Sequence, residues 1–338
     1  MTGATVLGID GGGSKTLIAV ADQGGSIVTM ARGEGINPLD RADWRDVLDR
    51  QLQPFIETQG LAGVVGALPA HGEVEAISAA QWQAVSSLFP KLPTEVLNDV
   101  DAAHIGAFAG GPGILVLSGT GSMAWARDGA GRSYRVGGWG DRIGDEGSSH
   151  WIGLRILGLV SQSLDGRAEP TRLVDAVFDQ LGLDRADPMN GLEGWSAHLT
   201  NPRAEIAALA PLASRVAETG DLGAIGIIEA AAEELARHVT TIGRQGSLPP
   251  IWSFAGGTFA SRPLRDAVAA KLGHPPVAPL LPPIGGALLR AAKTLGWSID
   301  PAWINRLAAS LAAYPAPSPQ NYAKPDQTSP DHQPRTIN

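Results

Sequence analysis

The sequence contains no cysteine, which excludes several classes of protein. A disulfide framework, a thiolate nucleophile, a cysteine-ligated zinc site and an iron–sulfur cluster all need sulfur ligands that this chain lacks. Its seven histidines do not occur at the spacing of a protein-only transition-metal site such as H-E-x-x-H. The sequence therefore predicts chemistry carried by oxygen and nitrogen groups.

Positive charge and long apolar runs are also scarce. The formal net charge is −8 with no basic block. Because binding to a nucleic-acid backbone requires a positive face, we expect no nucleic-acid partner. No apolar run approaches the roughly 18 residues of a membrane span, and no secretory signal opens the chain. We expect a soluble, cytoplasmic protein without membrane association.

Glycine, by contrast, is abundant. The chain has 43 glycines in 338 residues, well above the average share of about 7%. They cluster in short runs beside apolar segments, where glycine lets the backbone approach a ligand closely. Hydrophobic residues make up 43% and charged residues 18%, and the length suits two domains of about 100–200 residues each.

The order of strand and turn signals indicates a duplicated unit. In each half, an apolar strand runs into a glycine turn, and two more strands follow with an aspartate–glycine turn between them. The predicted strands cover 6–9, 17–20 and 26–31 in the first half and 114–117, 123–127 and 133–136 in the second. The repeat predicts two similar α/β domains, each presenting a glycine turn toward one cleft.

Helical periodicity accounts for most of the remaining chain. Helices are predicted over 43–58, 73–88, 102–109, 148–163, 171–181, 204–218, 222–244, 263–272, 285–295 and 301–313, and further strands over 64–68, 94–97 and 251–255. The expected division is an N-terminal domain over 1–112, a larger C-terminal domain over 113–297, a terminal helix over 298–314 and a disordered, proline-rich tail over 315–338.

The first glycine turn is a candidate site for phosphate groups. Successive backbone N–H groups in a tight glycine turn form a concave anion-binding surface, and glycine permits the positive φ that such a turn requires. A strand follows the turn rather than a helix, so it is not a P-loop. Asp10, at the preceding strand end, suits a water-mediated Mg²⁺ ligand. The alternative is an ordinary β-turn. The candidate phosphate-binding residues are Gly11, Gly12, Gly13, Ser14, Lys15 and Thr16.

Two further glycine segments repeat the theme. The second turn is also followed by a strand, which argues against a dinucleotide-binding fingerprint and leaves a phosphate turn or a plain hairpin. A third run follows the strand at 251–255 and is predicted to flank an adenosine. The candidate residues are Gly119, Thr120, Gly121 and Ser122 for phosphate, and Gly256, Gly257 and Thr258 for adenosine.

Two acidic segments are candidates for the remaining chemistry. Phosphoryl transfer to a hydroxyl needs a carboxylate that accepts the proton. Asp99 and Asp101 follow a strand and precede a helix, so either of them is a candidate base and either is a candidate helix cap. In the glycine-rich stretch 137–148, Asp145 and Glu146 are placed to bind sugar hydroxyls; alternatively, Ser148 or Asp145 caps the next helix.

Together these segments resemble the BadF/BadG/BcrA/BcrD-type ATPases, and within them the N-acetylglucosamine kinases, over about residues 5–295. The resemblance lies in G-I-D-G-G-G-S-K-T, L-S-G-T-G-S, S-F-A-G-G-T, P-P-I-G-G-A-L-L and, above all, G-G-W-G-D-R-I-G-D-E-G-S-S-H-W-I-G. It implies an α/β fold with two RNase H-like domains of the actin and hexokinase type around an interdomain cleft. The branch of the family that holds an iron–sulfur cluster is excluded because the chain has no cysteine.

By the same resemblance, Asn37 and Asp145 are predicted sugar contacts, and Gly138 and Glu146 of the same glycine-rich stretch as Asp145 are predicted to join them. The family's catalytic aspartate aligns with Asp99 through the Asn-Asp pair and with Asp101 through the following Asp-Ala-Ala; we favour Asp99. The implied function is an ATP- and Mg²⁺-dependent kinase for N-acetylglucosamine or glucosamine, acting on the 6-hydroxyl, with a homodimer fitting the family. N-acetylmuramic acid is a third candidate sugar. An ATPase switch acting on a protein partner and a sugar sensor are the alternatives.

Overall fold

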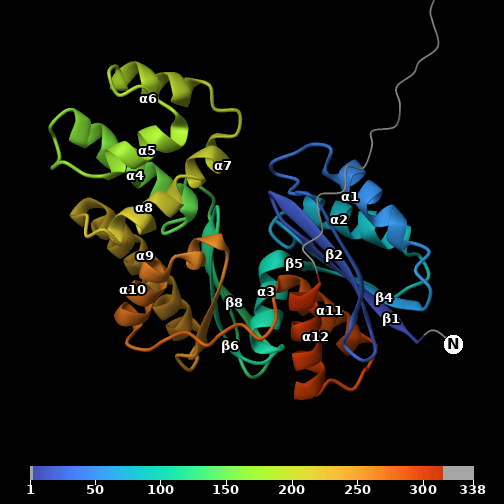
Figure 1. The fold of residues 1–338 in the computed structure, drawn as a ribbon. Helices are drawn as coiled ribbons and strands as arrows, with labels where there is room; N and C mark the ends of the chain where they lie inside the picture. Colours follow the sequence, from blue (N-terminus) through green and yellow to red (C-terminus); the bar gives the residue numbers. More distant parts are fainter. Residues whose placement is uncertain (1–2, 315–338) are drawn as a thin grey trace, which may run out of the picture.

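The computed structural model describes residues 3–314 and contains two mixed β-sheets, each at the centre of one lobe (Figure 1). The strand orders are β3-β2-β1-β4-β5 and β8-β7-β6-β9. The strands of the first sheet are β1 (Thr5–Gly11), β2 (Lys15–Asp22), β3 (Ile27–Glu34), β4 (Leu61–Leu68) and β5 (Thr94–Asn98). Those of the second are β6 (Gly113–Ser118), β7 (Ser122–Arg127), β8 (Ser133–Gly137) and β9 (Trp252–Ala255).

Both sheets have the same connectivity. Three strands form an antiparallel meander, and the next strand of the sheet, β4 or β9, pairs in parallel with the first of them. This confirms the duplicated meander predicted from the sequence. Each glycine turn lies in the first hairpin of its sheet, between β1 and β2 or between β6 and β7.

The first sheet is covered on both faces. Helices α1 (Trp44–Leu52) and α2 (Glu75–Leu88) cover one face, where Leu48 and Val85 pack with Leu7 of β1. Helices α3 (Asp99–Phe108), α11 (Pro283–Thr294) and α12 (Pro301–Ala313) cover the other, where Leu288 packs with Val6. Val6 and Leu7 point to opposite faces because side chains alternate along a strand.

The second lobe carries the remaining α-helices. They are α4 (Ser149–Leu164), α5 (Leu173–Leu181), α6 (Pro188–Ala197), α7 (Pro202–Ala207), α8 (Ala210–Ala217), α9 (Leu222–Gly246) and α10 (Arg262–Leu272). The long helix α9 buries Leu235 and Val239 against Ile114 and Val116 of β6. Within the described part of the chain, no helix is long and apolar enough to cross a membrane.

Helix α3 lies between the two sheets and contacts both (Figure 1). Ile105 belongs to the core of the first sheet, whereas Ala103 packs with Leu115 of the second. Helix α11 crosses α3 so closely that a Cβ atom on Gly286 would lie 1.9 Å from the carbonyl oxygen of Ala102. The two helices can meet this way only because the crossing position has no side chain.

Several elements differ from the sequence expectation. Helix α3 begins at Asp99 rather than at 102, because Asn98 caps it by accepting a hydrogen bond from the Val100 N–H at 3.0 Å. The helix expected over 204–218 is two helices, α7 and α8. Helix α6 was not expected; none of its residues is fully buried, and only Leu192 and Trp195 pack partly on the core of the second lobe.

The closing helices return to the first lobe. Residues 283–297 were grouped with the second domain from sequence order, but α11 packs on β1 and β4, and α12 packs in the same core. The apolar face of α11 is complementary to the first sheet, which has no other cover at that place. The disordered tail predicted over 315–338 lies outside the described residues.

Candidate active site

The first glycine turn connects β1 to β2. It is closed by a hydrogen bond from the Gly12 N–H to the carbonyl oxygen of Lys15 at 2.9 Å. The side chains of Ser14 and Lys15 are exposed, whereas Thr16 is fully buried and its hydroxyl donates to the carbonyl oxygen of Glu34 at 2.7 Å. Ser14 and Lys15 are therefore the side chains that this turn offers to a ligand.

The expectation of positive φ in this turn was wrong. Gly11, Gly12 and Gly13 are not among the residues with positive φ. Glycine is required there by space instead: a Cβ on Gly11 would lie 2.7 Å from Cδ1 of Ile36, and a Cβ on Gly35 would lie 2.0 Å from the Gly13 carbonyl oxygen. The following loop thus packs directly on the turn and shapes it.

Asp10 and Asp99 are two carboxylates on adjoining elements of the first lobe. Burial, together with the charge of Asp99, raises the pKa of Asp10 to about 7, and Lys15 opposes the shift. Burial likewise raises the pKa of Asp99 to about 6, with Glu73 adding to the shift and the Val100 N–H opposing it. Raised carboxylate pKa values that arise from burial together with a charged neighbour are typical of functional sites.

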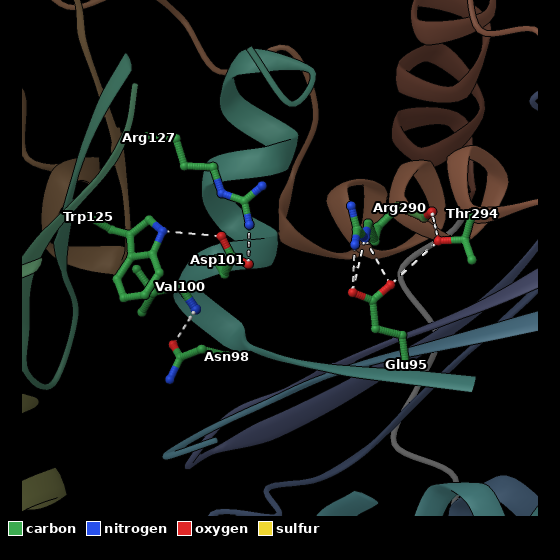
Figure 2. A network of polar contacts seen from close by, with 8 residues as sticks. All are labelled: Glu95, Asn98, Val100, Asp101, Trp125, Arg127, Arg290 and Thr294. Atoms are coloured by element: carbon green, nitrogen blue, oxygen red, sulfur yellow. Dashed lines mark hydrogen bonds and ion pairs between the residues drawn. The ribbon is translucent and has the colours of Figure 1, made fainter. Parts of the chain in front are cut away.

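Asp101 has a different environment. Its side chain is buried, and its two oxygens accept hydrogen bonds from Trp125 Nε1 at 3.2 Å and Arg127 Nη2 at 2.8 Å (Figure 2). Trp125 and Arg127 belong to β7 of the second sheet, so this carboxylate joins α3 to the second lobe. The two candidate aspartates, only two positions apart, therefore differ in their availability to a substrate.

The second glycine turn is enclosed by hydrogen bonds within its own lobe. Ser122 Oγ donates to the carbonyl oxygen of Glu146 at 2.6 Å, and the Ser149 N–H donates to the carbonyl oxygen of Gly119 at 2.8 Å. Thr258 Oγ1 donates to the same Gly119 oxygen at 3.3 Å. The three predicted segments of the second lobe thus meet at this turn.

Asp145 connects the second turn to the helices of the lobe. It has a φ of 62°, and its carboxylate accepts hydrogen bonds from the Ser122 N–H at 3.3 Å and from Arg203 Nη2 at 2.7 Å. The Asp145 side chain is only 4% exposed. It is therefore a buried, charge-paired group that holds the second turn against Arg203.

A cavity of about 320 Å³ opens beside the predicted adenosine segment. Gly257 and Thr258 line it together with Ser149, Ser214 and Ser261. Gly256 has a φ of 98° and passes so close to β6 that a Cβ would lie 2.2 Å from the Ser118 carbonyl oxygen. The cavity is therefore directly next to the second turn.

Two predicted sugar contacts lie on surface loops. Asn37 follows the first turn, and its carboxamide donates to Asp40 Oδ2 at 2.6 Å and accepts from the Leu39 N–H at 3.1 Å. Gly138 lies on the other lobe, and its carbonyl oxygen accepts a short hydrogen bond from Arg135 Nη2. Arg135 Nη1 also binds Glu73 Oε1 at 3.0 Å, so this contact bridges the two lobes.

Three charged residues of this region were missed by sequence reasoning. Glu73 adds to the pKa shift of Asp99, Arg135 pairs with Glu73, and Arg203 pairs with Asp145. Each stands outside any glycine or acidic motif. Sequence patterns did not identify them because their partners lie 26, 62 and 58 positions away.

These features define an α/β protein built from two RNase H-like domains, each with a mixed sheet and a glycine turn in its first hairpin. The chain belongs to the BadF/BadG/BcrA/BcrD ATPase family, whose model matches residues 7–291. The predicted family and fold class are thereby confirmed. Membership of an ATPase family implies that the chain binds ATP.

Three relatives illustrate where the chain lies in the family. It is 31% identical over 244 residues to an N-acetylmuramic acid/N-acetylglucosamine kinase of Clostridium acetobutylicum, which covers 70% of this chain and 78% of the relative. It is 27% identical over 294 residues to the glucosamine kinase GspK of Vibrio cholerae, covering 85% and 95%. The crystal structure of a candidate N-acetylglucosamine kinase from Chromobacterium violaceum matches with a TM-score of 0.67 at 28% identity, covering 86% and 99%.

Proposed function

We propose that this protein is an ATP-dependent amino-sugar kinase that phosphorylates N-acetylglucosamine or glucosamine at the 6-hydroxyl. The observation that carries the proposal is the environment of Asp99. Its carboxylate is half-buried at the start of α3, close enough to Asp10 of β1 for the two charges to interact, and has a pKa raised to about 6. Such a carboxylate is deprotonated near neutral pH and still basic enough to accept a proton from a hydroxyl.

In the proposed reaction, Asp99 accepts the proton of the sugar 6-hydroxyl while the hydroxyl oxygen attacks the terminal phosphorus of ATP. The bond from that phosphorus to the bridging oxygen breaks, and ADP leaves. Asp101 is not the base in this proposal, because Trp125 and Arg127 already occupy both of its oxygens. Asp101 instead holds α3 against the second lobe.

The remaining groups position the two substrates. The cavity beside Gly257 and Thr258 suits the adenosine, and the two glycine turns suit the phosphates. Lys15 supplies a positive charge at the first turn. The predicted sugar contacts Asn37 and Gly138 come from different lobes, so movement of the lobes toward each other would enclose the sugar and exclude water.

The residues present fit a magnesium ion that arrives with the nucleotide. Among the described residues, no group of three or more metal-binding side chains is arranged to hold an ion. Mg²⁺ commonly uses one or two carboxylates together with substrate phosphates, and Asp10 offers such a carboxylate. The ion would neutralise phosphate charge and relieve the repulsion that helps raise the pKa of Asp10.

The decisive experiment measures ADP release with a panel of N-acetylglucosamine, glucosamine and N-acetylmuramic acid. We expect ADP release that depends on one of these sugars and a sugar 6-phosphate as the product, identified by mass spectrometry. ATP turnover that is independent of every sugar would refute the kinase and favour an ATPase switch acting on a protein partner. Sugar binding without turnover would favour a sensor. The homodimer and the cytoplasmic location remain predictions, which gel filtration and cell fractionation test.

A further inference from the structure

We infer that Arg135 is a positioning residue that couples the loop at 137–140 to the position of the first lobe through Glu73. The inference rests on the proposed function, since Gly138 in this loop is the predicted sugar contact of the second lobe. Neither charged residue belongs to a motif that identifies the family. Their role follows from the contacts of one guanidinium group.

Arg135 lies at the middle of β8, just before the loop. Its Nε donates to the Gly137 carbonyl oxygen at 3.3 Å and its Nη2 donates to the Gly138 carbonyl oxygen. Gly137 and Gly138 have φ values of 77° and 72°, so both carbonyl groups are turned by a backbone that other residues rarely adopt. The guanidinium therefore satisfies the two carbonyls that this unusual conformation exposes.

The remaining nitrogen of the same guanidinium, Nη1, faces the first lobe. Arg135 Nη1 donates to Glu73 Oε1 at 3.0 Å, and Glu73 lies in the connection between β4 and α2. Glu73 also lies near enough to Asp99 to contribute to the pKa shift of that residue. The pair thus connects the surroundings of the proposed base with the loop predicted to contact the sugar.

The geometry makes the loop sensitive to the first lobe. When Glu73 is in place, it holds the guanidinium in the plane that reaches both loop carbonyls. If the lobes separate, Arg135 loses its only carboxylate partner among the contacts of the described residues and gains freedom to leave the loop. We therefore expect the loop to take its sugar-binding shape together with approach of the two lobes.

The test is a double-mutant cycle read on each substrate separately. Glu73→Gln leaves the loop bonds and should raise the KM for the sugar about two- to fivefold, the range for a partly exposed ion pair. Arg135→Ala also removes the hydrogen bonds to the Gly137 and Gly138 carbonyl oxygens and should raise the KM for the sugar about tenfold or more. In the KM for the sugar, the double variant should match Arg135→Ala alone, because Glu73 reaches the loop only through Arg135. The charge effect of Glu73 on Asp99 acts on the proposed base and should change kcat instead. The KM for ATP should stay unchanged, and Arg135→Lys should recover part of the loss.

Arg132→Ala is the matched control, since Arg132 pairs with Asp128 inside the same lobe. A second readout needs no sugar: amide hydrogen exchange of peptides covering 133–144 should quicken in Glu73→Gln and Arg135→Ala but not in Arg132→Ala. If no sugar supports turnover, the proposed function fails while the exchange measurement still decides the coupling. If wild type is an active kinase but the two single effects add, or exchange is unchanged in Glu73→Gln, the coupling is wrong.

Discussion

Asp101 on α3 and Arg127 on β7 form an ion pair of 2.8 Å that joins the two lobes. Trp125 donates to the other oxygen of the same carboxylate (Figure 2). Asp99, two positions earlier, accepts a hydrogen bond from the N–H of its neighbour Val100 at 2.9 Å, and no side chain of the described residues donates to it. One aspartate of the Asn-Asp-Val-Asp sequence is thus committed to structure, and the other is available for chemistry.

We predict that changing Asp99 to asparagine lowers the rate of catalysis, whereas changing Asp101 to asparagine lowers the stability of the fold. Asp99→Asn should lower kcat by about 10²- to 10⁴-fold, the usual contribution of a general base. Asp101→Asn should keep most of kcat but lower the free energy of unfolding by about 1–3 kcal/mol, because Arg127 loses its charged partner. Steady-state kinetics and urea unfolding of both variants separate these effects. Full activity of Asp99→Asn would reject it as the base.

The pair of Arg203 and Asp145 gives a second prediction. Arg203→Ala leaves a carboxylate with a 4% exposed side chain beside the second turn. We expect a loss of about 1–3 kcal/mol in unfolding free energy, the cost of an unsatisfied buried group. Adding Asp145→Asn should restore part of it, since the unpaired charge is then gone. Urea unfolding of the two single variants and the double variant measures this, and strictly additive losses would contradict it.

Asp10 gives a prediction for pH. Its pKa in the fold, about 7, exceeds the ordinary value of 3.8. The folded protein therefore binds the proton of the Asp10 carboxyl more tightly than the unfolded chain does. This bound proton stabilises the fold at low pH, and the stabilisation is lost as the pH rises from about 4 through 7. At pH 8 the charged group costs stability, so Asp10→Asn should raise the free energy of unfolding by about 1–2 kcal/mol.

The gain should shrink to a small part of this at pH 4, where the aspartate is protonated in the folded state and close to half protonated in the unfolded chain. Urea unfolding at the two pH values tests this, with activity measured in parallel. We expect the stabilised variant to have lost kinase activity, because the proposed magnesium ligand is missing. An equal change in stability at both pH values would show that the charge is not the cause.

The crossing of α3 and α11 gives a prediction for packing. Gly286→Ala places a methyl group where the Ala102 carbonyl oxygen lies 1.9 Å away, so the helices must separate. We expect destabilisation of about 3 kcal/mol or more, within the range of strongly overpacked sites. The matched control is Gly226→Ala in α9, which has open space around its Cβ position and should gain about 0.5–1 kcal/mol. Thermal unfolding of both variants checks the contrast.

The sequence was a good guide wherever local chemistry determines local structure. The two meanders, their glycine turns and most helices were predicted because strand alternation, turn residues and helical periodicity are properties of short segments. The start of α3 was placed three residues late, since a cap depends on which of several polar residues turns back to the chain. Helix α6 was missed because it has no buried stripe.

The site was predictable only where it lies in motifs. Asp10, the two phosphate turns and the segment containing Asp145 stand out as short glycine- and acid-rich runs. The choice between Asp99 and Asp101 as the proposed base depended on side chains of β7. The roles of Arg135 and Arg203 depended on ion-pair partners about sixty positions away in the sequence. Such pairings follow from tertiary packing, which no short window of sequence contains.

The return of α11 and α12 to the first sheet has a consequence for biosynthesis. Every strand and helix from β6 to α10 precedes them in the chain, so the second lobe can complete its core while the first still lacks the cover of one sheet face. Val6 and Ala19 pack in one core with Leu288, which leaves the ribosome more than 260 residues after them. The part of the protein that is translated first is thus the last to be finished, and its uncovered sheet is where a chaperone would be needed.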